Sequence, residues 1–119
     1  ALIPFTNDIP LVMNALDALV HPAVGTEALP TVILEALASG RPVIASRLNG
    51  IPETFVENQH GLLVPPDDVT ALAGAMRTLL ENSGLRARFG AAGPAHVREK
   101  FSRAIMAGRV CQLYRQLCA

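Results

Sequence analysis

The chain has 119 residues, half of them hydrophobic, which is enough for one domain with an apolar core. Only 4% of the residues are aromatic, which disfavours single-stranded nucleic acid as a partner, because its bases stack on aromatic side chains. No apolar run reaches membrane-spanning length and no secretory signal opens the sequence. We therefore expect a cytoplasmic protein in which Cys111 and Cys118 are reduced and packed against apolar neighbours.

The net charge is zero, but the charges are distributed unevenly along the chain. Residues 1–70 hold eight acidic residues and two basic ones, whereas residues 71–119 hold eight basic residues and two acidic ones. Solvated helix faces are the ordinary explanation and the favoured one. The alternative is a cationic surface for an anionic partner, either the inner face of the cell membrane or a lipid-linked substrate.

The first part of the chain alternates between strand and helix patterns. Strands are predicted at residues 2–5, 19–22, 42–46 and 61–64, and the last two are continuous apolar runs, typical of strands buried on both faces. Helices are predicted at residues 9–17 and 31–39, and Gly40 is expected to end the second in a left-handed conformation. A short helix is expected near Pro52.

The second part of the chain is predicted to be helical. Asp68 is expected to cap a helix whose buried stripe comprises Val69, Leu72, Ala73, Met76, Leu79 and Leu80. The next helix, at residues 84–100, is expected to be interrupted at Gly90 and at Gly93 and Pro94. The last begins after Ser102, and one of its sides is lined by Ile105, Met106, Val110, Leu113, Tyr114 and Leu117.

Alternating strands and helices predict an α/β fold, a Rossmann-like three-layer domain with a parallel sheet, followed by the C-terminal helices. A doubly wound nucleotide-binding sheet usually has about six strands, and this chain offers about four. We therefore expect a domain truncated at its N-terminus. A truncated sheet exposes a strand edge, which predicts self-association.

The segment TEALPTVILEALASG, residues 26–40, has the features of an anion site. Pro30 suits the first turn of a helix, where its missing N–H costs nothing. The positive end of the helix dipole and its free amides then favour a phosphate or diphosphate. The expected donors are the amides of Leu29, Thr31, Val32 and Ile33.

Two glutamates flank this helix start. Glu35 lies about 6–8 Å further along the helix, where its carboxylate can accept hydrogen bonds from two vicinal ribose hydroxyls. Glu27 precedes the helix and can meet a sugar beyond the phosphates. Most helical glutamates are merely solvated, but Glu35 lies between Leu34 and Ala36, so we expect it to be embedded. The segment thus fits a nucleotide-diphosphate sugar.

The run HPAVGTEALPTVILEALASGRPVIASRLNGIPETFVENQHGLLVPPDDVTALAGAM resembles the donor-binding C-terminal half of retaining glycosyltransferases of the GT-B fold. The motifs that carry the resemblance are the two glutamates followed by ASGRPVIAS, NGIPE and GLLVPP. The resemblance implies a hexose transfer from a nucleotide-diphosphate sugar to a saccharide or lipid-linked acceptor. It implies neither a cofactor nor a metal ion, and this truncated chain alone is not expected to turn over.

The resemblance also implies residue roles. Glu27 matches the catalytic glutamate beside the donor sugar, and Glu35 matches the residue that binds the ribose. The donor is further held by His21, Ala28, Leu29, Pro30, Thr31 and Val32. Ala28 replaces a glycine that is usual in the family, and the family's glycine-rich loop and basic pair, which neutralise the diphosphate, have no counterpart here. Arg41 and Arg47 are not obvious substitutes.

Other chemistries have weaker support. The three histidines lack metal-ligand spacing, and neither G-x-G-x-x-G nor a P-loop pattern occurs. Two alternatives remain open. One is a nucleotide-sugar epimerase of the same fold, and the other is a non-catalytic domain that serves assembly or stability.

Overall fold

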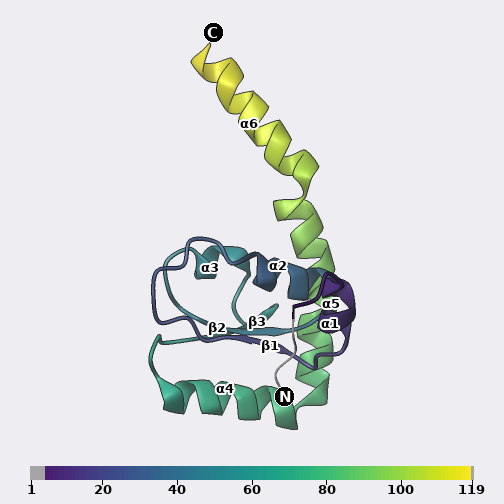
Figure 1. Ribbon diagram of the computed structural model, residues 1–119, viewed down its shortest axis with the longest axis vertical. Coiled ribbons are helices and arrows are strands. Elements are labelled where there is room, and N and C mark those ends of the chain that lie inside the picture. The colour runs from purple at the N-terminus through teal and green to yellow at the C-terminus, as the bar shows by residue number, and fades with distance from the viewer. Residues whose placement is uncertain (1–4, 119) are drawn as a thin grey trace.

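The computed structural model describes residues 5–118 and has an α/β fold around one parallel sheet (Figure 1). The described strands have the order β1-β2-β3, with Leu19 opposite Val43 and Val43 opposite Gly61. The elements in chain order are α1 (Ile9–Asn14), β1 (Leu19–His21), α2 (Thr31–Ala38), β2 (Val43–Ser46), α3 (Ile51–Thr54), β3 (Gly61–Val64), α4 (Val69–Glu81), α5 (Ser83–Phe101) and α6 (Arg103–Leu117).

The sheet has three described strands instead of the expected four. The predicted strand at residues 2–5 lies outside the described residues, apart from Phe5. Phe5 belongs to no strand and its side chain is 91% exposed, so it neither pairs with the sheet nor contributes to the core. The three other predicted strands agree with the structure to within one residue at each end.

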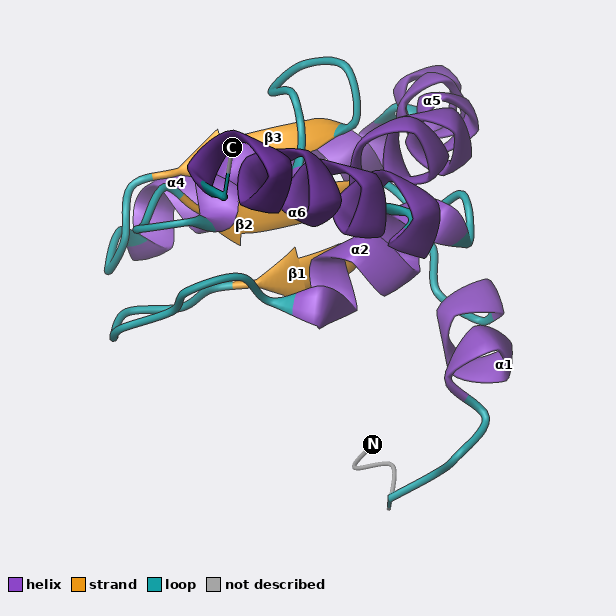
Figure 2. Ribbon diagram, turned by 90° about the horizontal axis from the view of Figure 1, so that it is seen from above, coloured by secondary structure: helices purple, strands orange, loops and turns teal. Residues whose placement is uncertain are grey.

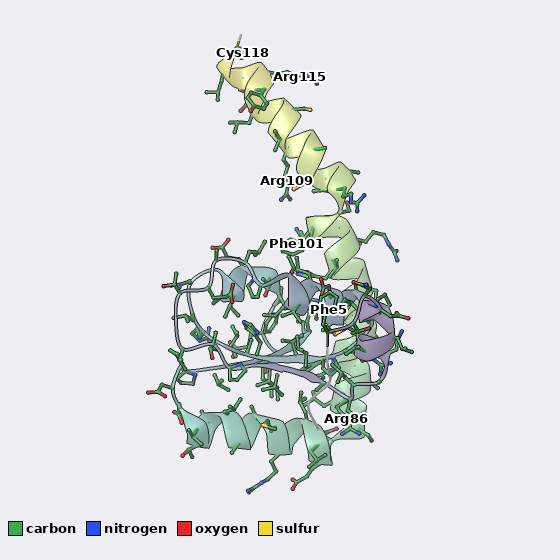
Figure 3. The ribbon with its side chains drawn as sticks, viewed as in Figure 1. Phe5, Arg86, Phe101, Arg109, Arg115 and Cys118 are labelled. Carbon is green, nitrogen blue, oxygen red and sulfur yellow. The ribbon has the colours of Figure 1, made fainter. Side chains whose placement is uncertain are left out.

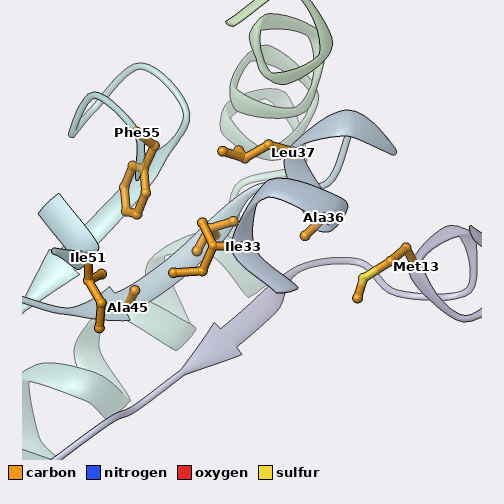
Figure 4. Close-up of a cluster of buried hydrophobic side chains, with 8 residues drawn as sticks. Met13, Ile33, Ala36, Leu37, Ala45, Ile51 and Phe55 are labelled. Atoms are coloured by element: carbon orange, nitrogen blue, oxygen red, sulfur yellow. The ribbon is translucent and has the colours of Figure 1, made fainter. Parts of the chain in front are cut away.

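Helices cover both faces of the sheet, with α4 on one face and α2 and α3 on the other (Figure 1). Every residue of β2 is buried, as its continuous apolar run predicts. Val43 and Ala45 join the cluster on the α2 side, and Ile44 joins the cluster on the α4 side, because successive strand residues point to opposite faces. Figure 4 shows the larger cluster, which contains Met13, Ile33, Ala36, Leu37, Val43, Ala45, Ile51 and Phe55.

Helix α2 ends as predicted. Gly40 has φ +70°, and the N–H of Arg41 donates to the carbonyl oxygen of Ala36 at 2.9 Å. Helix α5 packs against this end of α2 so closely that a Cβ atom on Gly93 would lie 2.5 Å from the carbonyl oxygen of Leu37. The predicted interruption of α5 is wrong, because Gly90, Gly93 and Pro94 all lie within one helix. The contact that the two glycines permit offsets their low helix propensity.

Helix α4 begins as predicted, since a carboxylate oxygen of Asp68 accepts the N–H of Ala71 at 2.8 Å. The predicted buried stripe of α4 is largely wrong, because Val69 and Leu80 are each 77% exposed and only Leu79 is buried. The helix does not close fully on the sheet. A cavity of about 640 Å³ remains between them, lined by Asp17, Ala18, Val20, Ile44, Ala73, Met76, Arg77, Leu79, Leu80, Glu81 and Arg86.

Helix α6 extends away from the rest of the molecule, as Figure 1 and the positions of Arg109 and Arg115 in Figure 3 show. None of its described residues is buried, so its apolar side has no partner among residues 5–118. Cys111 and Cys118 are exposed instead of packed, because α6 has no neighbour along most of its length. Within the described part of the chain, no helix is both long and apolar enough to cross a membrane.

Candidate functional site

The predicted site residues lie at the carboxyl end of the sheet. Because the strands are parallel, His21 at the end of β1 and Ser46 at the end of β2 lie at the same edge. Figure 2 shows the three arrowheads pointing to one side, where the segment after β1 extends away from the sheet. This segment, residues 22–30, is called the site loop here, and it leads into α2.

His21 and Glu27 meet at the base of the site loop. Nε2 of His21 lies 3.5 Å from Oε2 of Glu27, and the two side chains are 22% and 32% exposed. This distance is within ion-pair range, but Nε2 of His21 makes no hydrogen bond within the described part of the chain, although the atom itself is buried. The imidazole nitrogen and the carboxylate therefore lie close together, and the nitrogen retains an unused hydrogen-bonding capacity.

Helix α2 follows the site loop and offers two free amide groups at its start. Pro30 is the N-cap residue, and no side chain caps the helix. The expectation that the Ile33 amide is free is wrong, because its N–H donates to the carbonyl oxygen of Pro30 at 3.1 Å. Among residues 5–118, the amides of Thr31 and Val32 have no acceptor. These two N–H groups and the helix dipole favour an anion at this end.

Glu35 lies on the exposed face of α2, so the expectation that it is embedded is wrong. The apolar face of α2 is formed by Ile33, Ala36 and Leu37, which are fully buried. Residues spaced three or four apart share a helix face, and the exposed face therefore joins Thr31 to Glu35. The Cα atoms of Thr31 and Glu35 are separated by about 6 Å along the helix axis.

The remaining predicted residues differ in exposure, and they line neither of the two cavities described for residues 5–118. Ala28 and Leu29 are exposed, Val32 is half-buried and Pro30 is buried. The cavity beneath α4 is lined by none of the predicted site residues. A smaller cavity of about 140 Å³ lies at the strand ends but faces α4, and it is lined by Pro22, Val24, Ser46, Val64, Pro65, Asp67, Asp68, Val69 and Leu72.

The two arginines of the first seventy residues are occupied elsewhere. The guanidinium of Arg41 donates to the backbone oxygen of Asn14 at 3.0 Å, near the amino end of β2. The guanidinium of Arg47 donates to a carboxylate oxygen of Glu57 at 2.7 Å. Among the described residues, no group of three or more His, Cys, Asp or Glu side chains is arranged to hold a metal ion.

One contact at the site was not predicted from the sequence. The turn after β2 reaches the site loop, where Gly50 lies against the carbonyl group of Ala28. The dipeptide Asn49-Gly50 signals a turn, and the family resemblance implies that this turn lies next to the nucleotide in a supporting role, but neither signal identifies Ala28 as the residue it contacts.

The chain matches the profile of the family described as "Glycosyl transferases group 1" over residues 1–96. It belongs to the glycosyltransferase group 1 family. Among its relatives, the phosphatidyl-myo-inositol mannosyltransferase of Mycobacterium leprae is 36% identical over 86% of this chain and 27% of its own length. The chain thus spans about a quarter of the length of the curated relatives it matches.

Solved structures of this group share the fold. Anabaena HepE in complex with UDP superposes with a TM-score of 0.88 at 26% identity, over 94% of this chain and 31% of the other. The C-terminal domain of the glycosyl transferase group 1 protein LpcC from Francisella tularensis superposes with a TM-score of 0.75 at 31% identity, over 87% of this chain and 52% of the other. The chain therefore has the architecture of part of a GT-B glycosyltransferase.

Proposed function

We propose that residues 1–119 form most of the donor-binding C-terminal domain of a retaining glycosyltransferase. The enzyme transfers a hexose from a nucleotide-diphosphate sugar to a saccharide or lipid-linked acceptor. The single observation that carries this proposal is a series of polar groups, called the polar face here, that follow one another along the chain. They are the His21–Glu27 pair, the free amides of Thr31 and Val32, and the exposed carboxylate of Glu35.

Each part of this face fits one part of the donor. The two free amides and the dipole of α2 receive the diphosphate. The carboxylate of Glu35 accepts hydrogen bonds from the ribose hydroxyls, because it lies on the same side of α2 as Thr31. On the other side of the phosphates, Glu27 and His21 face the hexose.

The same groups support the transfer step. The bond between the anomeric carbon and the diphosphate oxygen breaks, the acceptor oxygen bonds to that carbon on the same face, and the acceptor proton passes to the leaving diphosphate. Negative charge grows on the diphosphate as the bond breaks, and the α2 amides are already oriented to stabilise it. Glu27 stabilises the positive charge that develops on the hexose.

The open surface of the site supports the view that this chain supplies half of a cleft. Glu35, Ala28 and Thr31 are exposed, and none of them lines either of the two cavities described above. The other half would come from an acceptor-binding domain, so the isolated chain is inactive in this proposal. HepE was crystallised with UDP, which supports a nucleotide-diphosphate donor.

The experiment that tests the proposal is a titration of the intact protein with UDP and with GDP. Binding is measured by calorimetry and by the amide signals of Thr31 and Val32. We expect one nucleotide to bind and to shift both signals. Glu35→Gln should weaken this binding, whereas Glu99→Gln, which changes an exposed glutamate of α5, should not.

The outcomes separate the candidate functions. An intact protein that binds neither nucleotide would favour a non-catalytic domain and contradict the proposal. A protein that binds and converts a nucleotide sugar without any acceptor would favour an epimerase. Transfer that depends on an acceptor and retains the anomeric configuration is the expected result.

A further inference from the structure

Gly50 touches the site loop in a way that its own backbone conformation does not explain. It has φ −79° and ψ −5°, a conformation that alanine adopts freely. A Cβ atom at this position would nevertheless overlap the carbonyl oxygen of Ala28 and lie 3.0 Å from the carbonyl carbon. Glycine is therefore needed here only because the site loop lies against it.

The turn that carries Gly50 is firmly held. The N–H of Ile51 donates to the carbonyl oxygen of Leu48 at 3.0 Å, and the N–H of Glu53 donates to that of Gly50 at 3.1 Å. Ile51 and Thr54 of the following helix α3 are fully buried, and Figure 4 shows Ile51 within the core cluster. A change at Gly50 therefore cannot be absorbed easily by movement of α3.

The site loop is the softer of the two partners. Within the described part of the chain, residues 23–29 make no backbone–backbone hydrogen bond outside the regular elements. Most of these residues are exposed, including Val24 at 69%. The position of Ala28, and with it that of the adjacent Glu27, therefore depends on what the loop rests against.

We propose that Gly50 is a positioning residue for Glu27. The absence of a side chain at Gly50 allows the carbonyl group of Ala28 to approach the turn, and this position of the site loop keeps Oε2 of Glu27 at 3.5 Å from Nε2 of His21. The consequence for glycosyl transfer rests on the proposed function. If Glu27 acts on the hexose, a displacement of its carboxylate by about 1 Å can lower the transfer rate by up to about 100-fold.

The test compares glycine-to-alanine variants of the intact protein. Gly50→Ala and Gly61→Ala each place a Cβ atom onto a backbone carbonyl oxygen, of Ala28 and Val43 respectively. Gly61 starts β3, at the opposite end of the strands from the site. Gly25→Ala changes the site loop itself, but its Cβ has no atom within 4 Å. The readouts are the melting temperature and the ring Cε1–H signal of His21 in protein with 13C-labelled histidine, assigned with His21→Gln.

We expect Gly50→Ala and Gly61→Ala to lower the melting temperature, but only Gly50→Ala to shift the His21 signal. Gly25→Ala should leave both unchanged. An unmoved His21 signal in Gly50→Ala, or an equal shift in Gly61→Ala, would overturn the proposal. If the wild type binds neither UDP nor GDP, the proposed function fails, yet the His21 signal still decides whether Gly50 positions Glu27.

A milder pair of variants covers the case in which Gly50→Ala does not fold. Asn49 and Asn58 have φ +46° and +62°, and glycine adopts such values readily. Asn49→Gly loosens the turn beneath the site loop and should change the His21 signal, whereas Asn58→Gly should not. For activity, we expect Gly50→Ala to lower kcat at least about tenfold with UDP-glucose or GDP-mannose as the donor. The Kd for the nucleotide should change less than about threefold, because α2, which binds the diphosphate in the proposed function, keeps its place in the core.

Discussion

His60 and His96 stack against each other, with ring centroids 4.4 Å apart and an angle of 36° between the ring planes. Nδ1 of His60 accepts the N–H of Val56 at 3.1 Å, and Nε2 of His96 lies 3.0 Å from the carbonyl oxygen of Thr54. The stack therefore joins α5 to the segment that follows α3. This segment is continuous with the turn that contacts the site loop.

The histidine stack predicts a loss of stability at mildly acidic pH. Burial lowers the pKa of His60 below its usual 6.5, and the charge of His96 lowers it further. Below about pH 6.5 the unfolded chain therefore binds this proton more readily than the folded chain, so the free energy of unfolding falls as the pH drops towards the folded-state pKa. Urea unfolding at pH 7.5 and 5.5 should show this decrease.

His60→Asn is the control for that measurement, because asparagine can still accept the Val56 N–H but does not titrate. The decrease in stability between pH 7.5 and 5.5 should be smaller in this variant than in the wild type. An equal decrease in both proteins would assign the pH dependence to groups other than His60.

Glu35 is predicted to recognise the ribose diol. Hydrogen bonds to a charged group contribute about 1.5–3 kcal/mol, so the wild type should bind UDP or GDP about 10- to 100-fold more tightly than the 2′,3′-dideoxy form. In Glu35→Gln this preference should largely disappear, because the neutral amide accepts the two hydroxyls less well. Calorimetry with each nucleotide and its dideoxy analogue measures both ratios.

Glu99→Gln provides the comparison, since Glu99 is an exposed glutamate of α5 that belongs to none of the predicted site residues. It should keep the wild-type preference for the ribose form. If Glu35→Gln also keeps it, Glu35 is one of the many solvated helical glutamates and the ribose is held by other groups.

Local sequence signals predicted the parts of the fold that short-range physics determines. Gly40 ends α2 and Asp68 caps α4, because each acts on amides or carbonyls within a few residues. The apolar runs that became β2 and β3 were also recognisable, since burial on both faces leaves a continuous pattern.

Features that depend on distant neighbours were not predicted. Glu35 was expected to be embedded, but the neighbours that cover α2 contact its other face. The apolar side of α6 was recognised from its spacing, although the described residues place nothing against it. The contact between Gly50 and Ala28 joins two loops that only the sheet brings together. Self-association through an exposed strand edge stays a prediction.

Asp68 provides a test of the capping signal. Asp68→Ala removes the acceptor for the Ala71 N–H and should lower the free energy of unfolding by about 1 kcal/mol, the usual contribution of an N-cap side chain. Asp68→Asn keeps an acceptor in the same place and should remain close to the wild type. Urea unfolding at neutral pH measures the difference, and equal stability of Asp68→Ala and the wild type would contradict the assigned role of the cap.

Two helical glycines are expected to respond to alanine in opposite ways, because one lies where α5 approaches the end of α2 and the other lies in open space. A Cβ atom on Gly90 would overlap the carbonyl oxygen of Gly40, so Gly90→Ala must push the helices apart and should destabilise the fold by about 1–3 kcal/mol. Gly74 lies in α4, where a Cβ would meet no atom within 4 Å. Gly74→Ala should therefore stabilise the fold by about 0.5–1 kcal/mol, because alanine has the higher helix propensity. Thermal and urea unfolding of both variants measure these shifts. Two stabilising substitutions would mean that α5 does not approach α2 at Gly40, and the explanation given for the uninterrupted α5 would then be wrong.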